Sequence, residues 1–226
     1  MKIIQRPKSL TSIVIERLRE SIIDGTIGLG ALLSEKQVAE SLGTSKTPVR
    51  EAFGYLQSFG LIDVLPQKGG VVFQPSPQDV RDLCDVRFQL ESLALRTSIE
   101  HDAAGLVDEL SRIIAKMVDV YDVAKPMAYQ KLDSELHLSF FKHCGNKLFA
   151  DAYELFRPRI CALRTHLSTP QPNLLNRSLE EHKMMLKLAK KRDVRRITLL
   201  LEEHINRTRK CHSEILEKTN SVPRSA

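Results

Sequence analysis

Apolar residues recur at helical spacing in three segments of the first sixty positions, with polar residues between them. In residues 10–24, the positions expected to face inward are Ile13, Val14, Leu18 and Ile22. In residues 34–43 they are Val38, Ala39 and Leu42, and beyond residue 45 they are Val49, Ala52, Phe53 and Leu56. This spacing predicts three short helices, each of which buries one face.

The segments between these helices contain residues that typically begin and end helices. Ser34, with Gln37 three residues later, is typical of a capping box, and Gly43 ends the helix that follows. Thr44 or Ser45 then offers the N-cap of the third helix. The last two helices, joined by a glycine turn, are expected to form a helix-turn-helix that the first helix braces.

A β-hairpin is predicted directly after the third helix. Residues 61–65 and 71–74 are short β-prone runs, and the Pro-Gln-Lys-Gly-Gly segment between them supplies glycine for positive φ. A helix-turn-helix followed by a hairpin is a winged module, and Lys68 lies at the tip of this wing. Pro75 and Pro77 interrupt regular secondary structure, so we place a domain boundary after residue 75.

The rest of the chain contains long helical patterns and no convincing strand. The predicted helices occupy residues 77–100, 103–124, 127–143, 147–164, 175–190 and 193–218. The expected fold is therefore mainly α. Residues 1–75 would form the winged helix-turn-helix domain, and residues 76–226 an antiparallel all-α bundle of about six helices.

Composition changes this picture only slightly. The 226 residues carry a formal net charge of +6, which permits a nucleic-acid partner without requiring one. A basic run over residues 187–196 is interpreted as a solvated helix junction. The four cysteines lack C-x-x-C spacing, which indicates reduced and mostly buried thiols. No apolar run approaches the roughly 18 residues of a membrane span, so we expect a cytoplasmic protein.

Candidate chemistry occurs on three of the predicted bundle helices. Asp133 and His137 stand four residues apart, so both side chains point the same way and can share a cation. His182 and His204 lie on two later helices. Taken alone, this pattern is only suggestive, because such pairs occur by chance and each histidine could be a surface or core residue.

The third helix and its flanks resemble a known family. TSKTPVREAF and LQSFGLI, with LRESIIDGTI before them and GLIDVLPQKGGVVF spanning the hairpin, are similar to the winged module of the GntR superfamily of bacterial transcription regulators. The resemblance implies DNA contacts by Lys36, Ser45, Lys46, Thr47, Arg50, Lys68 and Gly69. The chain departs from the family pattern at Leu29, where proline is usual, and at Lys46, where arginine is usual. A lysine favours phosphate contact over forked base reading.

The bundle resembles the FCD type of ligand-binding domain found in the FadR-like branch of that superfamily. The shared pattern is D-x-x-x-H, then Gly-Asn, then Glu-His, then a final histidine near the C-terminus. It implies a divalent metal held by Asp133, His137, His182 and His204, with a small carboxylate effector completing the coordination. One carboxylate and three imidazoles suit Zn, Ni, Mn or Fe better than Ca or Mg.

Two further residues match positions that are associated with the effector in that branch. Arg87 could clamp an effector carboxylate, or it could pair with Glu91 one turn on. Asn146 could donate to the effector, although a cap of the following helix is favoured. The remaining histidines do not match the pattern and are interpreted as ordinary; they are His101, His143, His166 and His212.

The sequence therefore predicts an effector-controlled transcription regulator, not an enzyme, that binds a pseudo-palindromic DNA operator as a homodimer. Two alternatives stay open. One is a metal-dependent hydrolase with an accessory DNA-binding head, in which Glu181 is the only near candidate for a general base. The other is a metal-free regulator that binds an acyl thioester. The sequence names neither the effector nor the operator.

Overall fold

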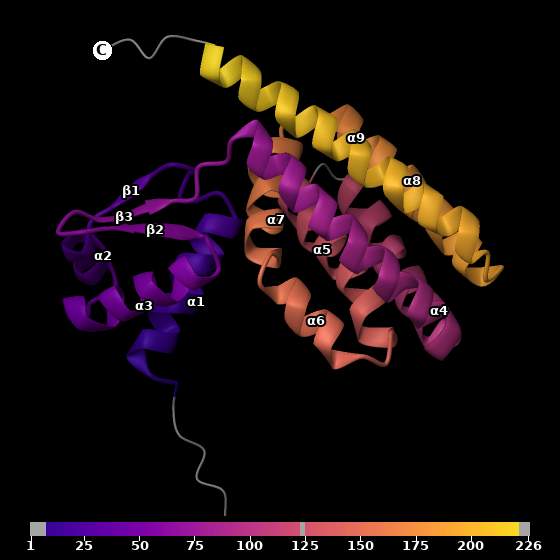
Figure 1. The fold of residues 1–226 in the computed structure, drawn as a ribbon, viewed down its shortest axis with the longest axis horizontal. Helices are drawn as coiled ribbons and strands as arrows, with labels where there is room; N and C mark the ends of the chain where they lie inside the picture. Colours follow the sequence, from indigo (N-terminus) through magenta and orange to yellow (C-terminus); the bar gives the residue numbers. More distant parts are fainter. Residues whose placement is uncertain (1–7, 123–124, 222–226) are drawn as a thin grey trace, which may run out of the picture. The chain divides into compact units, whose positions relative to one another are not determined.

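A computed structural model of the chain describes residues 8–122 and 125–221. The chain divides into two compact units, Met1–Gln74 and Pro75–Ala226. Figure 1 labels the helices and strands of each unit. The predicted end of the helix at 103–124 lies outside the described residues.

Within the described residues, the first unit contains three helices and a small antiparallel sheet (Figure 1). Its elements are α1 (Leu10–Ile23), β1 (Leu32–Leu33), α2 (Glu35–Ser41), α3 (Lys46–Ser58), β2 (Ile62–Leu65) and β3 (Gly69–Val72). The strand order is β1-β3-β2. The predicted helix-turn-helix with its hairpin is confirmed, but β1 is absent from the prediction. Two residues are too few to show alternation, and β1 forms only because β3 pairs with it.

The core of the first unit follows the predicted helical faces. Val14, Leu18 and Ile22 of α1 and the four predicted positions of α3 are all buried. Two predicted inward positions are wrong. Ile13 is 41% exposed because it lies about 100° around the helix from Val14, and Leu42 is 38% exposed because α2 has already ended at Ser41.

Backbone geometry at the turns explains the residues found there. Ser34 is the N-cap of α2 and accepts from the backbone N–H of Gln37, although at a long 3.5 Å. In the hairpin, Gln67 as well as Gly69 adopts positive φ, at 61° and 96°. Gly69 is the stricter requirement, because a Cβ there would overlap the backbone carbonyl oxygen of Leu33.

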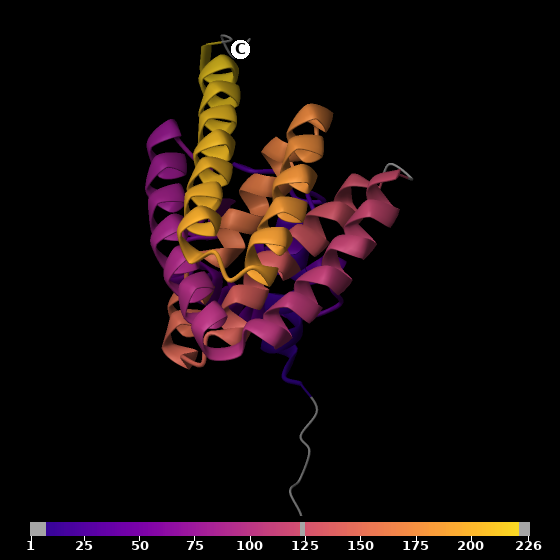
Figure 2. The same ribbon diagram turned by 90° about the vertical axis from the view of Figure 1, so that its right-hand side faces the viewer.

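The described part of the second unit is a helical bundle (Figures 1 and 2). Its elements are α4 (Pro77–Asp122), α5 (Pro126–His143), α6 (Lys147–Glu154), α7 (Arg157–Leu163), the π-helix η1 (Arg164–Ser168), α8 (Pro172–Lys190) and α9 (Val194–Ser221). Helix α4 begins at a capping box in which the Asp79 N–H donates to Ser76 Oγ at 3.1 Å. No helix in the described ranges is both long and apolar enough to cross a membrane.

Helix α4 runs through the break predicted near residue 102 but bends there. Asp102 has φ −146° and ψ 62°, which are not helical values, and the two arms diverge from this point in Figure 2. His143 at the end of α5 fixes the bend. Its Nδ1 lies 2.7 Å from Asp102 Oδ2 and its Nε2 lies 2.7 Å from Glu109 Oε2.

The helix predicted at residues 147–164 is interrupted, which corrects the prediction. It consists of α6, α7 and the start of η1. Pro158 lies in the first turn of α7, where its missing N–H costs nothing, but it cannot continue α6 because its ring would clash with the carbonyl of Glu154. The wider turn of η1 begins at Arg164, which is buried.

Replacement of Gly69 with alanine should unfold the wing. Because the added Cβ meets the backbone of β1 and φ is positive, we expect Gly69→Ala to destabilise the first unit by more than about 2 kcal/mol. Urea denaturation combined with amide hydrogen exchange in β3 measures this loss.

Gly54 provides the matched control. It lies in α3, and a Cβ there would meet no atom within 4 Å. Gly54→Ala should therefore raise stability by about 0.5–1 kcal/mol. If the two alanine variants were equally stable, the close approach of Gly69 to Leu33 would not be a constraint.

Candidate metal centre and nucleic-acid interface

Four side chains that can bind a metal lie together in the interior of the second unit. Asp133 and His137 come from α5, His182 from α8 and His204 from α9. All four are buried, and one potential ligand atom from each lies within 4.8 Å of the others. The fold therefore brings together the four residues that the sequence analysis singled out, and this cluster could bind a metal.

His137 is oriented by Glu91 of α4. Its Nδ1 lies 2.7 Å from Glu91 Oε2, a contact at ion-pair distance that places the carboxylate on the Nδ1 side of the ring, although Oε2 accepts no hydrogen bond from a described residue. Burial lowers the pKa of His137 to about 4, which keeps the ring neutral near pH 7. Nε2 then carries the lone pair. Arg87 Nη2 lies 2.9 Å from Nε2, so Arg87 and a cation would compete for this lone pair.

His204 is oriented in the same way by Glu181 of α8, whose Oε2 lies 2.8 Å from Nδ1. Arg207 Nε and Arg177 Nε each donate to Glu181 Oε1 at 3.1 Å. Burial alone would raise the pKa of Glu181, but its hydrogen bonds to His204 and Arg207 hold that pKa well below its usual range. A carboxylate with three partners is a poor general base, so the hydrolase alternative loses its one candidate.

His182 differs from the other two histidines because its ring has no orienting partner. Both ring nitrogens are buried and make no hydrogen bond to any residue that the structure describes. Nε2 faces Asp133 Oδ1 at 3.6 Å, and burial holds the pKa of His182 well below its usual value. A buried polar group without a partner is costly. A cation among the four side chains would provide the missing interaction for one of the two ring nitrogens, the one that carries the lone pair.

Asp133 pairs with an arginine that the sequence analysis did not single out. Arg164 Nε lies 3.1 Å from Asp133 Oδ2, and both side chains are buried. Burial alone would raise the pKa of Asp133, but Arg164 and then the three histidines hold it well below its usual range. The sequence signal that could have identified Arg164 is its position directly after the apolar run ICAL.

A small polar cavity of about 20 Å³ lies beside the cluster. Its polar lining includes Arg87, Gln130, Asp133, Arg164 and Ser168. Gln130 Nε2 and Arg164 Nη2 are buried, and neither has a hydrogen-bond partner in the described part of the chain. Two arginines and two unused donors around one cavity suit an anionic ligand.

Arg87 combines the two roles that the sequence analysis left open. Its Nε donates to Glu91 Oε1 at 2.8 Å, so the predicted ion pair is present. The same side chain lines the polar cavity. Tyr153 also donates to Glu91 Oε1, at 2.8 Å, so Glu91 is the shared anchor of α4 in the bundle.

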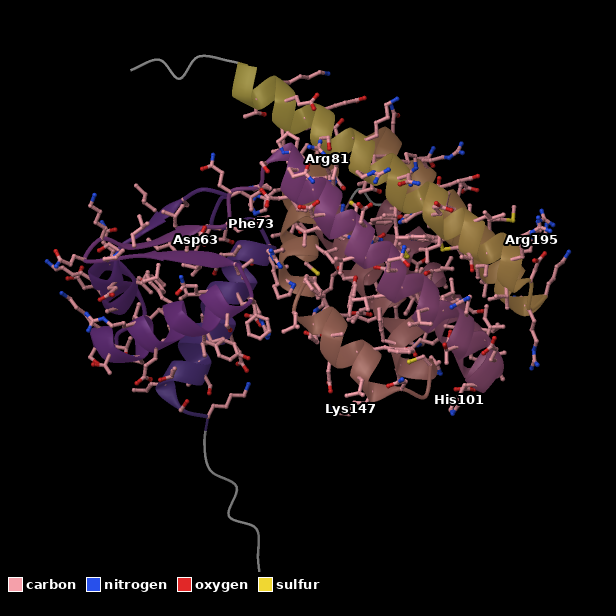
Figure 3. The ribbon with its side chains drawn as sticks, in the orientation of Figure 1. Asp63, Phe73, Arg81, His101, Lys147 and Arg195 are labelled. Carbon is pink, nitrogen blue, oxygen red and sulfur yellow. The ribbon has the colours of Figure 1, made fainter. Side chains whose placement is uncertain are left out.

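Asn146 occupies the position of a cap. Its side-chain oxygen accepts from the Leu148 N–H at 3.0 Å, which makes it the N-cap of α6. The cavity beside Asp133 is not lined by Asn146. Figure 3 labels the next residue, Lys147, at the same end of the helical unit as His101. The favoured reading as a cap is therefore confirmed, and effector contact stays a prediction.

One histidine interpreted as ordinary lies next to the cavity. His212 is buried, and its Nε2 lies 2.7 Å from the hydroxyl of Ser168, which lines the cavity. Burial lowers the pKa of His212 to about 3, so the neutral ring fixes the Ser168 hydroxyl through one hydrogen bond. Because His212 lies eight residues after His204 on α9, helical spacing was the signal that could have found it.

The residues predicted to contact DNA all lie on the first unit, and all but one of them are exposed. Exposed side chains are Lys36, Ser45, Lys46, Thr47, Arg50 and Lys68. Gly69 is buried, and its place is explained by the close approach to Leu33. A direct contact between Gly69 and DNA is thus unnecessary to explain the residue.

Arg50 on α3 is held by a residue of α2. Its Nε and Nη2 donate to the two carboxylate oxygens of Glu35 at 3.2 and 2.8 Å. This forked pair holds the pKa of Glu35 below its ordinary value. Because Arg50 remains 69% exposed, Glu35 limits the conformations of a guanidinium that still faces solvent.

Comparisons with known families match both units. Residues 82–207 match the FCD domain, and residues 10–72 match the bacterial regulatory proteins of the gntR family.

Two curated relatives match most of the chain. The gluconate operon transcriptional repressor of Bacillus subtilis is 27% identical over 80% of this chain and 75% of its own length. The uncharacterized HTH-type transcriptional regulator BphR of Paraburkholderia xenovorans is 28% identical over 88% of this chain and 83% of its own length.

Solved structures share the fold. McbR/YncC of E. coli has a TM-score of 0.76 and 21% identity, covering 95% of this chain and all of that chain (100%). A GntR regulator from Rhodococcus sp. RHA1 has a TM-score of 0.80 and 20% identity, covering 91% of this chain and 98% of that chain. Both likenesses confirm the mainly helical fold with a small N-terminal sheet.

Loss of the Asp133 carboxylate should leave Arg164 buried without its closest counter-charge. With a chelator present throughout, we expect Asp133→Asn to destabilise the second unit by about 3 kcal/mol or more. Asp151→Asn is the control. It breaks an exposed pair with Lys147, so the loss there should stay below about 0.5 kcal/mol. Similar losses in urea denaturation of both variants would contradict the role assigned to the buried pair.

The stabilisation by Asp133 should also depend on pH in a defined direction. Its pKa is lower in the folded protein than the unfolded value of about 3.9, so the charged carboxylate stabilises the fold above that pH. As pH falls below about 4, toward the folded pKa, this contribution is lost. The difference between wild type and Asp133→Asn should therefore shrink on acidification.

Proposed function

This chain belongs to the FCD domain family of GntR-type transcriptional regulators, and we propose that a small carboxylate effector, bound at a transition-metal site, controls its affinity for an operator. Residues 1–75 would be the DNA-binding domain, and residues 76–226 the effector-binding and dimerisation domain. The observation that carries the proposal is the pair of unpartnered nitrogens of His182 beside Asp133, His137 and His204.

The proposed ligands of the metal are Asp133, His137, His182 and His204. Their chemistry suits Zn, Ni, Mn or Fe, because imidazole binds these ions well and Ca or Mg prefers an oxygen shell. Glu91 and Glu181 support the site, since Glu181 accepts from Nδ1 of His204 and Glu91 Oε2 lies 2.7 Å from Nδ1 of His137. When bound, such an ion supplies a Lewis-acidic centre that attracts a carboxylate.

The carboxylate group of the proposed effector, its head, lies in the polar cavity beside the cluster. Arg87 and Arg164 are rigid planar donors that match a carboxylate, and Gln130 Nε2 offers a further donor. The polar character of this cavity disfavours the alternative of a metal-free site for a long apolar thioester at the centre of the bundle. The hydrolase alternative is weaker still, because Glu181 is fully engaged and the family consists of transcription regulators.

The proposed mode of DNA binding is a homodimer on a pseudo-palindromic operator. One winged module reads only a short half-site, and two related by a twofold axis read both halves. Effector binding would favour one arrangement of the two modules, so operator affinity would change with it. Curated relatives are named as repressors of gluconate and D-xylose utilization operons, which supports a repressor role here.

Removal of His182 should abolish the effect of metal on stability. Saturation with metal at about 100 to 1,000 times its dissociation constant adds roughly 3 to 4 kcal/mol to a folded domain. Wild type should therefore melt at a lower temperature when a chelator is added, and His182→Ala should not respond. His101→Ala, an exposed histidine outside the cluster, should respond like wild type. A wild-type protein without transition metal and without a chelator response would contradict the proposal.

Arg50 and Glu35 should affect specificity more than overall affinity. We expect Arg50→Ala to lose about 1–3 kcal/mol of discrimination between operator and random duplex, because arginine can fork onto a guanine. Glu35→Ala should also reduce discrimination, since Arg50 loses its support, while the removal of a negative charge should increase binding to random DNA.

The lysines should behave differently in the same titrations. Lys36→Ala and Lys46→Ala should weaken binding to all sequences and reduce the salt dependence by about one charge each, as phosphate contacts do. Lys147→Ala, which removes an exposed lysine from the second unit, is the control and should change neither quantity. Unchanged discrimination in Arg50→Ala would exclude the proposed docking of α3.

A further inference from the structure

A second, larger pocket adjoins the polar cavity. Its volume is about 330 Å³, and its lining is mainly apolar, with one charged side chain among the described residues, that of Lys125. The apolar lining comes from Val120 and Tyr121 of α4, Pro126 and Tyr129 of α5, and Leu175 of α8. For comparison, an apolar cavity of roughly 150 Å³ holds a benzene molecule. The pocket is therefore large enough for an aryl group or a short acyl chain.

Tyr129 and Leu175 form the wall between the two spaces. Both residues line the polar cavity and both line the apolar pocket. The Tyr129 hydroxyl donates to the backbone carbonyl of Leu175 at 3.3 Å, which joins α5 to α8 across this wall. A ligand that occupied both spaces would pass this hydrogen bond.

The inner cavity is too small for more than the head of a ligand. Its volume of about 20 Å³ is close to the 10–15 Å³ that one water molecule requires by the same measure. Its unused donors, Gln130 Nε2 and Arg164 Nη2, can serve a carboxylate there. A carbon chain of several atoms does not fit in the same space. The body of the effector must then lie on the far side of Tyr129.

The π-helix η1 and the residue after it connect the two spaces. Arg164 and Ser168 of η1 line the inner cavity, and Thr169 lines the apolar pocket. The Thr169 hydroxyl is buried and has no hydrogen-bond partner in the described residues. Short π-helical segments are frequent at functional sites. Here η1 turns one continuous segment toward both halves of a site.

We propose that the effector is a carboxylate with an apolar body of about five to eight carbon atoms, not a small polar acid. This inference rests on the proposed function for the carboxylate head. The head lies in the inner cavity, where Arg87, Arg164 and Gln130 face it, and the body fills the pocket between Val120, Tyr121 and Leu175. The Tyr129–Leu175 contact opens to let the chain pass.

The test uses three probes that share one head group and differ in chain length. Acetate, butanoate and hexanoate are titrated into the zinc-loaded full chain by isothermal titration calorimetry. Each buried methylene should strengthen binding by roughly fourfold, so hexanoate, with four more methylenes than acetate, should bind about 250-fold more tightly. Equal affinities for acetate and hexanoate would overturn the inference but leave the carboxylate site intact. Failure of all three probes to bind would contradict the proposed function itself.

Variants at Val120 separate the pocket from the head site. Val120→Trp fills the pocket, so affinity should no longer increase with the chain length of the probe. Acetate should bind as it does to wild type. Val120→Ala disrupts the fold less. It should reduce the affinity ratio of hexanoate to acetate about threefold or more, because contacts with the chain are lost. The control is Val118→Trp, a half-buried valine on the same arm of α4 that does not line the pocket. A chain-length gain that persists in Val120→Trp and Val120→Ala would place the body elsewhere.

Discussion

The pairing of buried charges at the centre of the second unit constrains the rest of that unit. Arg87, Glu91, Asp133 and Arg164 are all buried, and a charge without a partner there would cost several kcal/mol. Arg87 and Glu91 pair within α4, whereas Arg164 of η1 pairs with Asp133 of α5. Glu91 also lies against the neutral ring of His137 of α5, which links α4 to α5. The helices can shift relative to one another only if these pairs break. The same contacts therefore stabilise the bundle and fix the candidate ligands.

Periodicity was sufficient to predict the elements whose burial depends on local spacing. The faces of α1 and α3 were predicted from apolar positions, and the errors at Ile13 and Leu42 lie at the edge of a stripe and beyond a helix end. The failures have a different cause. Strand β1 and η1 exist because of partners distant in sequence, and neither two residues nor one widened turn leaves a periodic signal.

The candidate site shows the same division. Asp133 and His137 share a face by spacing alone, whereas His182 and His204 were joined to them only by resemblance to a family. Arg164 was missed, since a single arginine in an apolar run has no partner that the sequence identifies. Tertiary packing brings that partner, Asp133, next to Arg164. It also brings Glu181 next to His204 and His212 next to Ser168. Orienting groups are therefore harder to predict than ligands, because their identity depends on packing.

Charge balance links the proposed metal to the proposed effector. The buried arginines Arg87 and Arg164 offset the carboxylates Glu91 and Asp133. The third buried carboxylate, Glu181, is offset by Arg207 and Arg177, and burial keeps the neighbouring histidines neutral. A divalent cation would add two positive charges in a region of low dielectric, where they are poorly screened. It would also compete with Arg87 for His137 Nε2, so the guanidinium would be released toward the cavity that it lines. An anionic head restores the balance and gives Arg87 a new acceptor. Metal and carboxylate should therefore bind cooperatively, each strengthening the other by the same factor.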